Sequence, residues 1–174
     1  MHARADKITQ HYGQVASKRG LENRTLSPRF VLLHTLGHLL INKLVFECGY
    51  SSASLRERLY VSTTPGRAMA GLLIYTAAGD SEGTMGGLVR MARPDNVRAV
   101  FASALNDARW CSTDPVCMDA GEKGHGPESC NLAACHGCAL IPETSCEEFN
   151  RFLDRGLVIG TFERPDLGYF SSLA

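Results

Sequence analysis

Six of the seven cysteines of the 174-residue chain lie close together in its C-terminal half. Within a stretch of 36 positions the chain carries Cys111, Cys117, Cys130, Cys135, Cys138 and Cys146. The segment Cys135-His136-Gly137-Cys138 is a Cys-x2-Cys knuckle, in which two sulfurs at the ends of a short turn can chelate one metal ion. Such a cluster predicts a metal site before it predicts disulfide bridges.

The spacing favours one structural zinc site. Structural zinc takes four sulfur or nitrogen ligands in a tetrahedron, often as two pairs separated by roughly 15 to 20 residues. Between Cys117 and Cys135 there are 17 residues, whereas Cys111 and Cys117 have five between them, which is wider than is usual within a pair. The predicted ligands are Cys111, Cys117, Cys135 and Cys138.

Cys146 is the reserve ligand. It is expected in the first turn of a helix over 146–155, where the helix dipole lowers the pKa of a thiol. Cys130 and His136 are weaker candidates. Four thiolates close the coordination sphere, so we expect a structural metal, Zn²⁺, that supplies folding energy to a segment poor in apolar side chains. An iron–sulfur cluster suits the same thiolates, and the cysteines could also be ordinary thiols or, at the knuckle, a redox dithiol.

A glycine-rich loop could carry different chemistry. Gly79-Asp80-Ser81-Glu82-Gly83 matches the G-x-S-x-G pattern of a serine hydrolase elbow and follows an expected strand. Against this function, the only later histidines lie in the cysteine segment, and no oxyanion-loop motif is present. With Gly86 and Gly87, the loop fits neither a Walker A nor a dinucleotide-binding pattern, so we expect no nucleotide hydrolysis by this chain. A serine hydrolase that uses Ser81 is kept as the alternative function.

The basic residues are mostly arginines and lie mostly in the first part of the chain. Eighteen basic residues balance eighteen acidic ones, but 14 of the basic ones are found in residues 1–109. Arginine suits bidentate contact with phosphate or carboxylate. As a set they could form a patch for nucleic acid or a partner protein, although each alone is most simply a solvated charge. The candidates are Arg56, Arg58, Arg67, Arg90, Arg93 and Arg98.

His34, His38 and Asn42 form one polar stripe at i, i+4, i+8 spacing in an otherwise apolar segment. The two histidines could face one ion. The string HTLGH, however, lacks the glutamate of the HExxH zinc-protease motif, which leaves no catalytic base there. The simpler interpretation is a stripe that is hydrogen-bonded in the core or faces solvent.

The elements that must position these residues can be read from caps and periodicity. Ser27-Pro28 and Gly49 bound a buried helix over 28–48, and a short polar helix before it ends near Gly20. Strands are expected at 59–62 and 69–76, the second buried on both faces, and an amphipathic helix at 95–110. Overlapping capping boxes predict the helix at 146–155, and 157–162 could be a final strand. The predicted fold is α+β or α/β, with a short central sheet, a buried N-terminal helix and a zinc-stapled C-terminal subdomain.

Composition is that of a folded protein, with 44% hydrophobic and 21% charged residues. The first residues include no apolar signal-peptide segment, and the apolar stretch 30–46 is shorter than the ~20 residues of a spanning helix. We therefore expect a cytoplasmic protein, with its thiols reduced and no membrane partner.

Several long strings resemble a known family. They are SPRFVLLHTLGHLLI, ECGYSSASLRERLY, GLLIYTAAGDSEGTMGGL, CSTDPVC and ACHGCALIPETSCEEFNRFLDR. Together they resemble the C-terminal region of the DrmB family, subunits of the DISARM anti-phage system, and more generally the MrfA-like zinc-binding domain of some DNA-repair helicases. The likeness covers about residues 27–160. It implies the same four cysteine ligands, and it matches a further family pattern to Cys146, Asn150, Leu153, Asp154 and Arg155.

The resemblance also implies a function. The chain would be a zinc-binding accessory module, without catalytic activity, that contacts DNA or a DrmA-like helicase subunit during restriction of phage. A pure protein-interaction scaffold is a further possibility. Family members are several times longer, so we expect a fragment, a split gene product or a stand-alone module. Its parts would be an N-terminal polar segment at 1–26, the domain at 27–162 with a zinc subdomain at about 111–155, and a tail at 163–174.

Overall fold

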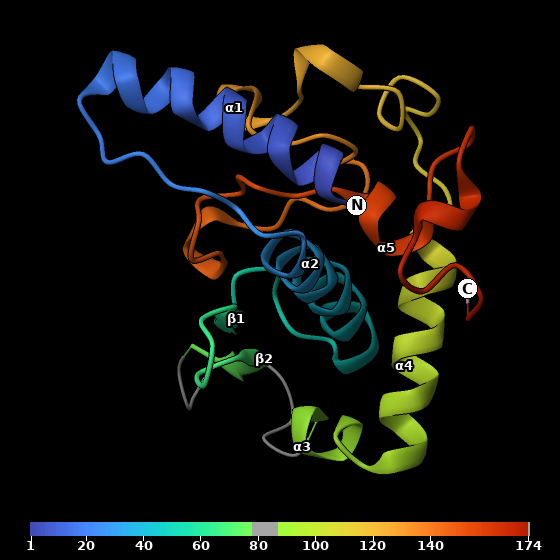
Figure 1. Cartoon of the computed structure of the whole chain (residues 1–174). Helices are drawn as coiled ribbons and strands as arrows, with labels where there is room; N and C mark the ends of the chain where they lie inside the picture. Colours follow the sequence, from blue (N-terminus) through green and yellow to red (C-terminus); the bar gives the residue numbers. More distant parts are fainter. Residues whose placement is uncertain (78–86, 174) are drawn as a thin grey trace.

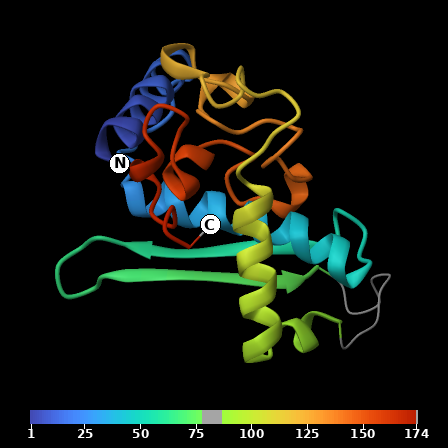
Figure 2. The same cartoon turned by 90° about the vertical axis from the view of Figure 1, so that its right-hand side faces the viewer.

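The computed structural model of the chain describes residues 1–77 and 87–173, and its longest helix, α2 (Pro28–Cys48), runs through the middle (Figures 1 and 2). The predicted caps are confirmed. The Ser27 hydroxyl accepts the Phe30 backbone N–H at 3.2 Å, and Gly49 ends the helix in the left-handed region with φ 69°. Apolar side chains on several sides of α2 are buried, so the other elements assemble around it.

By length and composition alone, α2 could cross a membrane, because it has 21 residues and a window of mean hydropathy 1.3. Half of that window is buried inside the fold. The buried residues include His34, Thr35 and His38, whose side chains make polar contacts with other elements or with the helix backbone. The apolar character of α2 is accounted for by its place in the core.

Helix α1 (His2–Arg19) packs on the same core as α2, and ends at Gly20 as the sequence predicts. Its buried face carries Ala5, Ile8, Tyr12 and Ala16. Its first turn is also joined to the C-terminal part by Arg4, whose guanidinium donates to both oxygens of the fully buried Asp154 at 2.5 and 2.7 Å. The N-terminal segment is therefore part of the packed structure.

The sheet is a two-stranded antiparallel hairpin, β1 (Leu55–Ser62) with β2 (Met69–Thr76), whose first pair is Leu55 with Thr76. One face of the hairpin lies against α2 (Figure 1). The prediction that 69–76 is buried on both faces is wrong, because no second layer covers the outer face within the described residues and Leu73 is 47% exposed. Strand β1 also begins four residues earlier than expected. The α+β class itself is confirmed.

Two helices follow the segment 78–86. Helix α3 (Gly87–Met91) leads into α4 (Pro94–Asp107), which confirms the predicted amphipathic helix and buries Val100, Ala104 and Leu105 against α2. The predicted Ser81 elbow, with Gly79, Asp80, Glu82, Gly83 and Gly86, lies outside the described residues. Gly87 is buried at the start of α3.

The C-terminal part consists of loops and short helices. They are η1 (Gly121–Lys123), η2 (Pro127–Ser129), η3 (Glu143–Ser145), α5 (Arg155–Ile159) and η4 (Pro165–Leu167).

The predicted helix over 146–155 and the strand over 157–162 are both wrong. Phe149, Asn150 and Phe152 have φ between 53° and 67°, which a right-handed helix does not allow. The Asn150 side chain instead holds the backbone of Ile141, donating to its carbonyl at 2.7 Å and accepting its N–H at 3.0 Å. The helix α5 begins only at Arg155, and the side chain of the N-cap residue Asp154 accepts the Gly156 N–H.

Candidate metal centre

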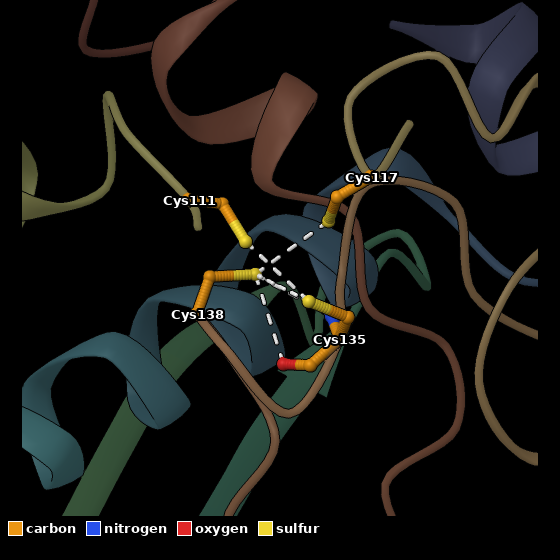
Figure 3. A group of neighbouring side chains, drawn as sticks. All are labelled: Cys111, Cys117, Cys135 and Cys138. Carbon is orange, nitrogen blue, oxygen red and sulfur yellow. Dashed lines mark hydrogen bonds between the residues drawn. The ribbon is translucent and has the colours of Figure 1, made fainter. Parts of the chain in front are cut away.

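Two loops bring four cysteine sulfurs together. Cys111 and Cys117 lie in the turn segment after α4, and Cys135 and Cys138 lie in the knuckle about 20 residues later (Figure 3). All four Sγ atoms are within 4.8 Å of one another. Cys111, Cys117 and Cys135 are buried and Cys138 is half-buried.

The spacing of the sulfurs fits a tetrahedral metal ion. The Sγ–Sγ distances are 3.4 Å for Cys111–Cys135, 3.7 Å for Cys117–Cys138 and 3.8 Å for Cys135–Cys138. Four sulfurs at ~2.3 Å from a central Zn²⁺ would lie about 3.8 Å apart. A disulfide needs ~2.05 Å, so these are four separate thiols. The donor set fits Zn²⁺, and four sulfurs leave no position for water or substrate.

A buried ion pair shapes the loop that carries the first two cysteines. The Asp114 carboxylate accepts the backbone N–H of Cys111 at 2.9 Å and of Met118 at 3.1 Å. Arg155, which is fully buried, donates to both Asp114 oxygens at 2.7 and 2.9 Å and to the Ala108 carbonyl at 2.7 Å. Arg155 thereby connects the end of α4, this loop and α5.

The knuckle is a tight turn that leaves little room for a side chain at Gly137. Cys138 N–H donates to the Cys135 carbonyl at 3.1 Å, and Gly137 N–H points to Cys135 Sγ at 3.3 Å. A Cβ on Gly137 would lie 2.8 Å from Ser112 Oγ and 3.3 Å from Cys111 Sγ. The glycine therefore lets the two cysteine pairs approach closely without displacing the Ser112 hydroxyl.

The protonation of the four thiols depends on whether a metal ion is bound. The pKa of Cys117 is raised, first by its hydrogen bond to Cys138 and then by burial and the other thiols. The same hydrogen bond, opposed by burial and helped by the Cys135 backbone and the Arg155 charge, lowers the pKa of Cys138. Four thiolates packed this closely repel one another, whereas a bound Zn²⁺ would deprotonate them.

The remaining cysteine candidates lie elsewhere. Cys130 is buried in the main core and its sulfur faces the Glu128 carbonyl, while His136 is exposed at the tip of the knuckle. Cys146 does not lie in a helix, so the dipole argument for it is wrong. Burial, with the nearby Glu57 carboxylate, raises the pKa of Cys146 to about 12.

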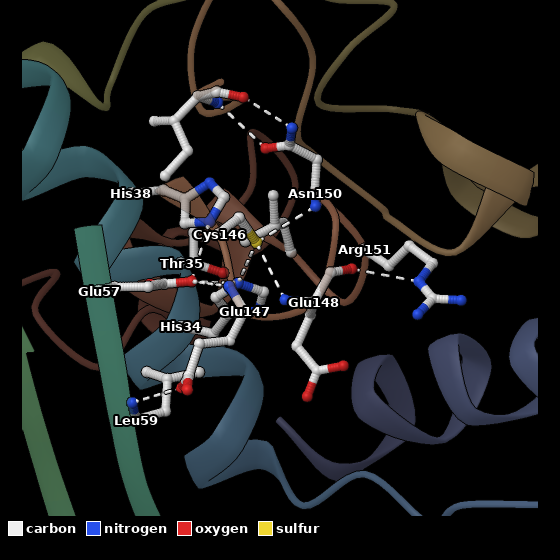
Figure 4. Close-up of polar contacts among 12 residues, drawn as sticks. His34, Thr35, His38, Glu57, Leu59, Cys146, Glu147, Glu148, Asn150 and Arg151 are labelled. Carbon is white, nitrogen blue, oxygen red and sulfur yellow. Dashed lines mark hydrogen bonds and ion pairs between the residues drawn. The ribbon is translucent and has the colours of Figure 1, made fainter. Parts of the chain in front are cut away.

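Cys146 belongs to a second buried group, with His34, His38 and Glu57 (Figure 4). The helical spacing placed the two histidines on one face, but Glu57 was not predicted. The signal for Glu57 is the alternation in β1, where the inward Leu55 and Glu57 alternate with the exposed Arg56 and Arg58. A buried acid at an inward strand position is unusual, because carboxylates are rarely buried without a partner.

The arginine candidates do not form one patch. Arg56 and Arg58 are neighbours on the outer face of β1, and Arg58 is paired with Glu147 at 2.6 Å. Arg67 lies in the hairpin loop, whereas α3 lies near the opposite end of the hairpin (Figure 2). Arg90 is in α3, Arg93 precedes α4 and Arg98 is in α4. All six are exposed.

Comparisons with known proteins agree with a zinc-binding fold. Residues 36–139 match the family of the MrfA Zn-binding domain, and this range includes all four cysteines of the cluster. The chain is also 39% identical over 171 residues to the DISARM protein DrmB of Bacillus paralicheniformis (strain ATCC 9945a / NCIMB 11709 / CD-2). That match covers 98% of this chain but spans only 29% of the relative.

Proposed function

This chain belongs to the MrfA Zn-binding domain family, and on that premise we propose that it is a zinc-binding accessory module of a DISARM-like anti-phage complex. The observation that carries the proposal is the cluster of four cysteine sulfurs in a chain of this family. The module has no catalytic activity of its own, and Zn²⁺ is held by Cys111, Cys117, Cys135 and Cys138. It acts in the cytoplasm, where the thiols stay reduced.

The zinc has a structural role. Four sulfurs satisfy a tetrahedral ion, so the metal neither activates water nor contacts substrate. It joins the loop after α4, where Asp114 pairs with Arg155 of α5, to the knuckle, whose neighbour Ala139 packs in the core with α2. Zinc binding therefore stabilises the C-terminal part against unfolding.

The DNA-contacting surface is the outer face of the hairpin. Tyr60 and Tyr75 are 47% and 39% exposed there, beside the exposed Arg56 and Arg58. In the register of the strands, Arg56 is paired with Tyr75. Among the described residues the Arg56 guanidinium makes no ion pair or hydrogen bond, so it is available. Arginines between aromatic rings bind single-stranded nucleic acid, by contacting phosphates and stacking bases.

In the whole assembly this surface would work beside a DrmA-like helicase subunit. A module without a nucleotide-hydrolysing motif cannot move along DNA by itself, so it would hold the strand on which the helicase acts. A scaffold that binds only protein is the competing function. The two differ in salt dependence, because phosphate contacts release counterions and weaken as salt rises.

The test is binding of a fluorescent single-stranded oligonucleotide by the zinc-loaded chain between 50 and 200 mM salt. We expect affinity to fall with salt, and Arg56→Ala to weaken binding and to reduce the slope by about 0.7 for the lost phosphate contact. Tyr75→Ala should weaken binding with little change of slope, because it removes stacking. Arg164→Ala, an exposed arginine paired with Asp166, is the matched control and should leave binding unchanged.

Absence of salt-dependent binding to single-stranded or duplex DNA would contradict the DNA contact and favour the protein scaffold. Equal losses in Arg56→Ala and Arg164→Ala would also contradict it, since binding would then depend on overall charge and not on the hairpin.

A further inference from the structure

The side chains of the second buried group come from three parts of the chain. His34 and His38 extend from one face of α2, Glu57 from the inner face of β1, and Cys146 from the segment after η3 (Figure 4). His34 Nε2 lies 3.0 Å from Glu57 Oε1 and 3.2 Å from Cys146 Sγ, and His38 Nε2 lies 3.4 Å from the same Glu57 oxygen. All four ligand atoms are within 4.8 Å of one another.

Glu57 is a buried carboxylate with no permanent cation beside it. It is 2% exposed, and the two histidines are fully buried. Its described contacts are the two histidine rings, the Cys146 thiol and the backbone N–H of Glu147 at 3.4 Å, with no Arg or Lys side chain among them. A buried charge without a charged partner is strongly destabilising, so the group requires either a proton on one of its members or a metal ion.

The hydrogen bonding of His38 favours the metal ion. Its Nδ1 lies 2.7 Å from the Ala139 carbonyl, which can only accept, so Nδ1 carries a hydrogen. In a neutral ring, Nε2 then presents a lone pair toward the Glu57 carboxylate, which is repulsive. An Nδ1–H bonded to a backbone carbonyl is the usual arrangement in histidines that bind a metal through Nε2.

Three side-chain atoms of the group have no hydrogen-bond partner. His34 Nδ1, His38 Nε2 and Glu57 Oε2 are buried and unsatisfied within the described structure. Gly37, between the two histidines in sequence, leaves room for the carboxylate, because a Cβ there would be 2.7 Å from Glu57 Oε2. Buried polar atoms are rarely left unpaired, so the unsatisfied His38 Nε2, which faces Glu57 Oε1, indicates a missing ligand.

Two backbone N–H groups would stabilise a thiolate at Cys146, although burial and the Glu57 carboxylate disfavour it without a metal ion. Its sulfur faces the backbone N–H groups of Glu148 at 3.3 Å and Asn150 at 3.2 Å (Figure 4). Such N–H groups stabilise a negatively charged sulfur. A metal ion would supply the charge that deprotonates the thiol.

We propose that His34, His38, Glu57 and Cys146 form a second zinc site, separate from the four-cysteine centre. Two imidazole nitrogens, one carboxylate oxygen and one thiolate are ordinary zinc ligands. All four are buried, which closes the coordination sphere and makes the zinc structural. An iron site with two histidines and one carboxylate would need open coordination positions. Here the Cys146 sulfur takes one of these positions, and burial keeps other ligands away from the rest. The second zinc joins α2, the hairpin and the segment after η3.

The test counts zinc in the 174-residue chain after saturation with Zn²⁺ and dialysis. We expect two zinc ions per chain, and X-ray absorption should find five sulfur and three nitrogen or oxygen neighbours over the two. His38→Ala should reduce the count from two to one and leave an all-sulfur shell. Cys135→Ser should remove the other ion, and Cys130→Ser, a buried cysteine outside both groups, should keep both.

One zinc per wild-type chain, with four sulfur neighbours, would overturn the second site and leave Glu57 paired with a protonated histidine. So would two zinc ions that both survive His38→Ala and Glu57→Gln. The wild-type spectrum decides the question even if a variant fails to fold. Failure of the four-cysteine centre would be seen separately, as a zinc count in Cys135→Ser that equals the wild-type count.

Discussion

Replacement of Arg155 by methionine should destabilise the chain far more than replacement of a similar arginine on the surface. Arg155 is fully buried and holds both oxygens of Asp114, which in turn hold the backbone of Cys111 and Met118. Arg155→Met keeps much of the side-chain volume but leaves the Asp114 carboxylate without its cation. Breaking one partner of a buried ion pair costs about 3 to 5 kcal/mol.

That cost is a large share of the ~5 to 15 kcal/mol by which domains are stable. With a urea m-value of about 2 kcal/mol/M, the unfolding midpoint should fall by about 1.5 to 2.5 M. The assay is urea unfolding by circular dichroism at fixed free zinc. The single tryptophan, Trp110, precedes Cys111 and gives a fluorescence signal from the loop itself.

Arg164→Met is the matched control. Arg164 also binds both oxygens of an aspartate, Asp166, at 3.0 and 2.9 Å, but both side chains are exposed. Water screens this pair and replaces its hydrogen bonds, so the control should leave the midpoint unchanged. If Arg155→Met lowers the midpoint no more than Arg164→Met, the ion pair does not hold the cysteine loop.

Three further outcomes follow from single contacts, each measured by urea unfolding. Ser27→Ala removes the N-cap of α2 and should cost about 1 kcal/mol, whereas Ser27→Asp should keep most of it; equal losses in both would contradict the cap. Asn150→Ala leaves the buried N–H and carbonyl of Ile141 unpaired. One unpaired buried group costs about 1 to 3 kcal/mol, so the free energy of unfolding should fall by at least this amount. An unchanged urea midpoint would refute this. Burial raises the pKa of Cys130 from 9.0 to about 11. Between these pH values the unfolded chain loses the thiol proton that the folded chain keeps, so the free energy of unfolding falls as pH rises. Cys130→Ala should make this fall shallower, and an identical pH profile in the variant would contradict the assignment.

Local signals sufficed for the helices that carry caps. The ends of α2 could be predicted from Ser27, Pro28 and Gly49, because these residues act on the backbone within a few positions. The apolar period of α4 predicted a helix correctly, because its buried face packs on α2. The same signals failed at Cys146. There Asn150 holds the backbone of Ile141, and this contact overrides the capping boxes.

The four-cysteine group could be proposed from sequence because its pairs lie in two short segments. The second group could not, because Glu57 joins His34 and Cys146 only when β1 packs on α2. Nothing near Glu57 in the sequence marks it as buried, apart from the alternation of β1. Contacts between distant segments depend on packing, which composition and period do not specify.

The most direct test of the central claim is native mass spectrometry of the zinc-loaded chain beside Cys135→Ser and Cys130→Ser. Both cysteines are buried, and only Cys135 belongs to the four-cysteine centre. The account predicts that Cys135→Ser loses one zinc ion relative to wild type, while Cys130→Ser keeps the full complement. Full zinc retention in Cys135→Ser, or the same loss in both variants, would contradict the centre.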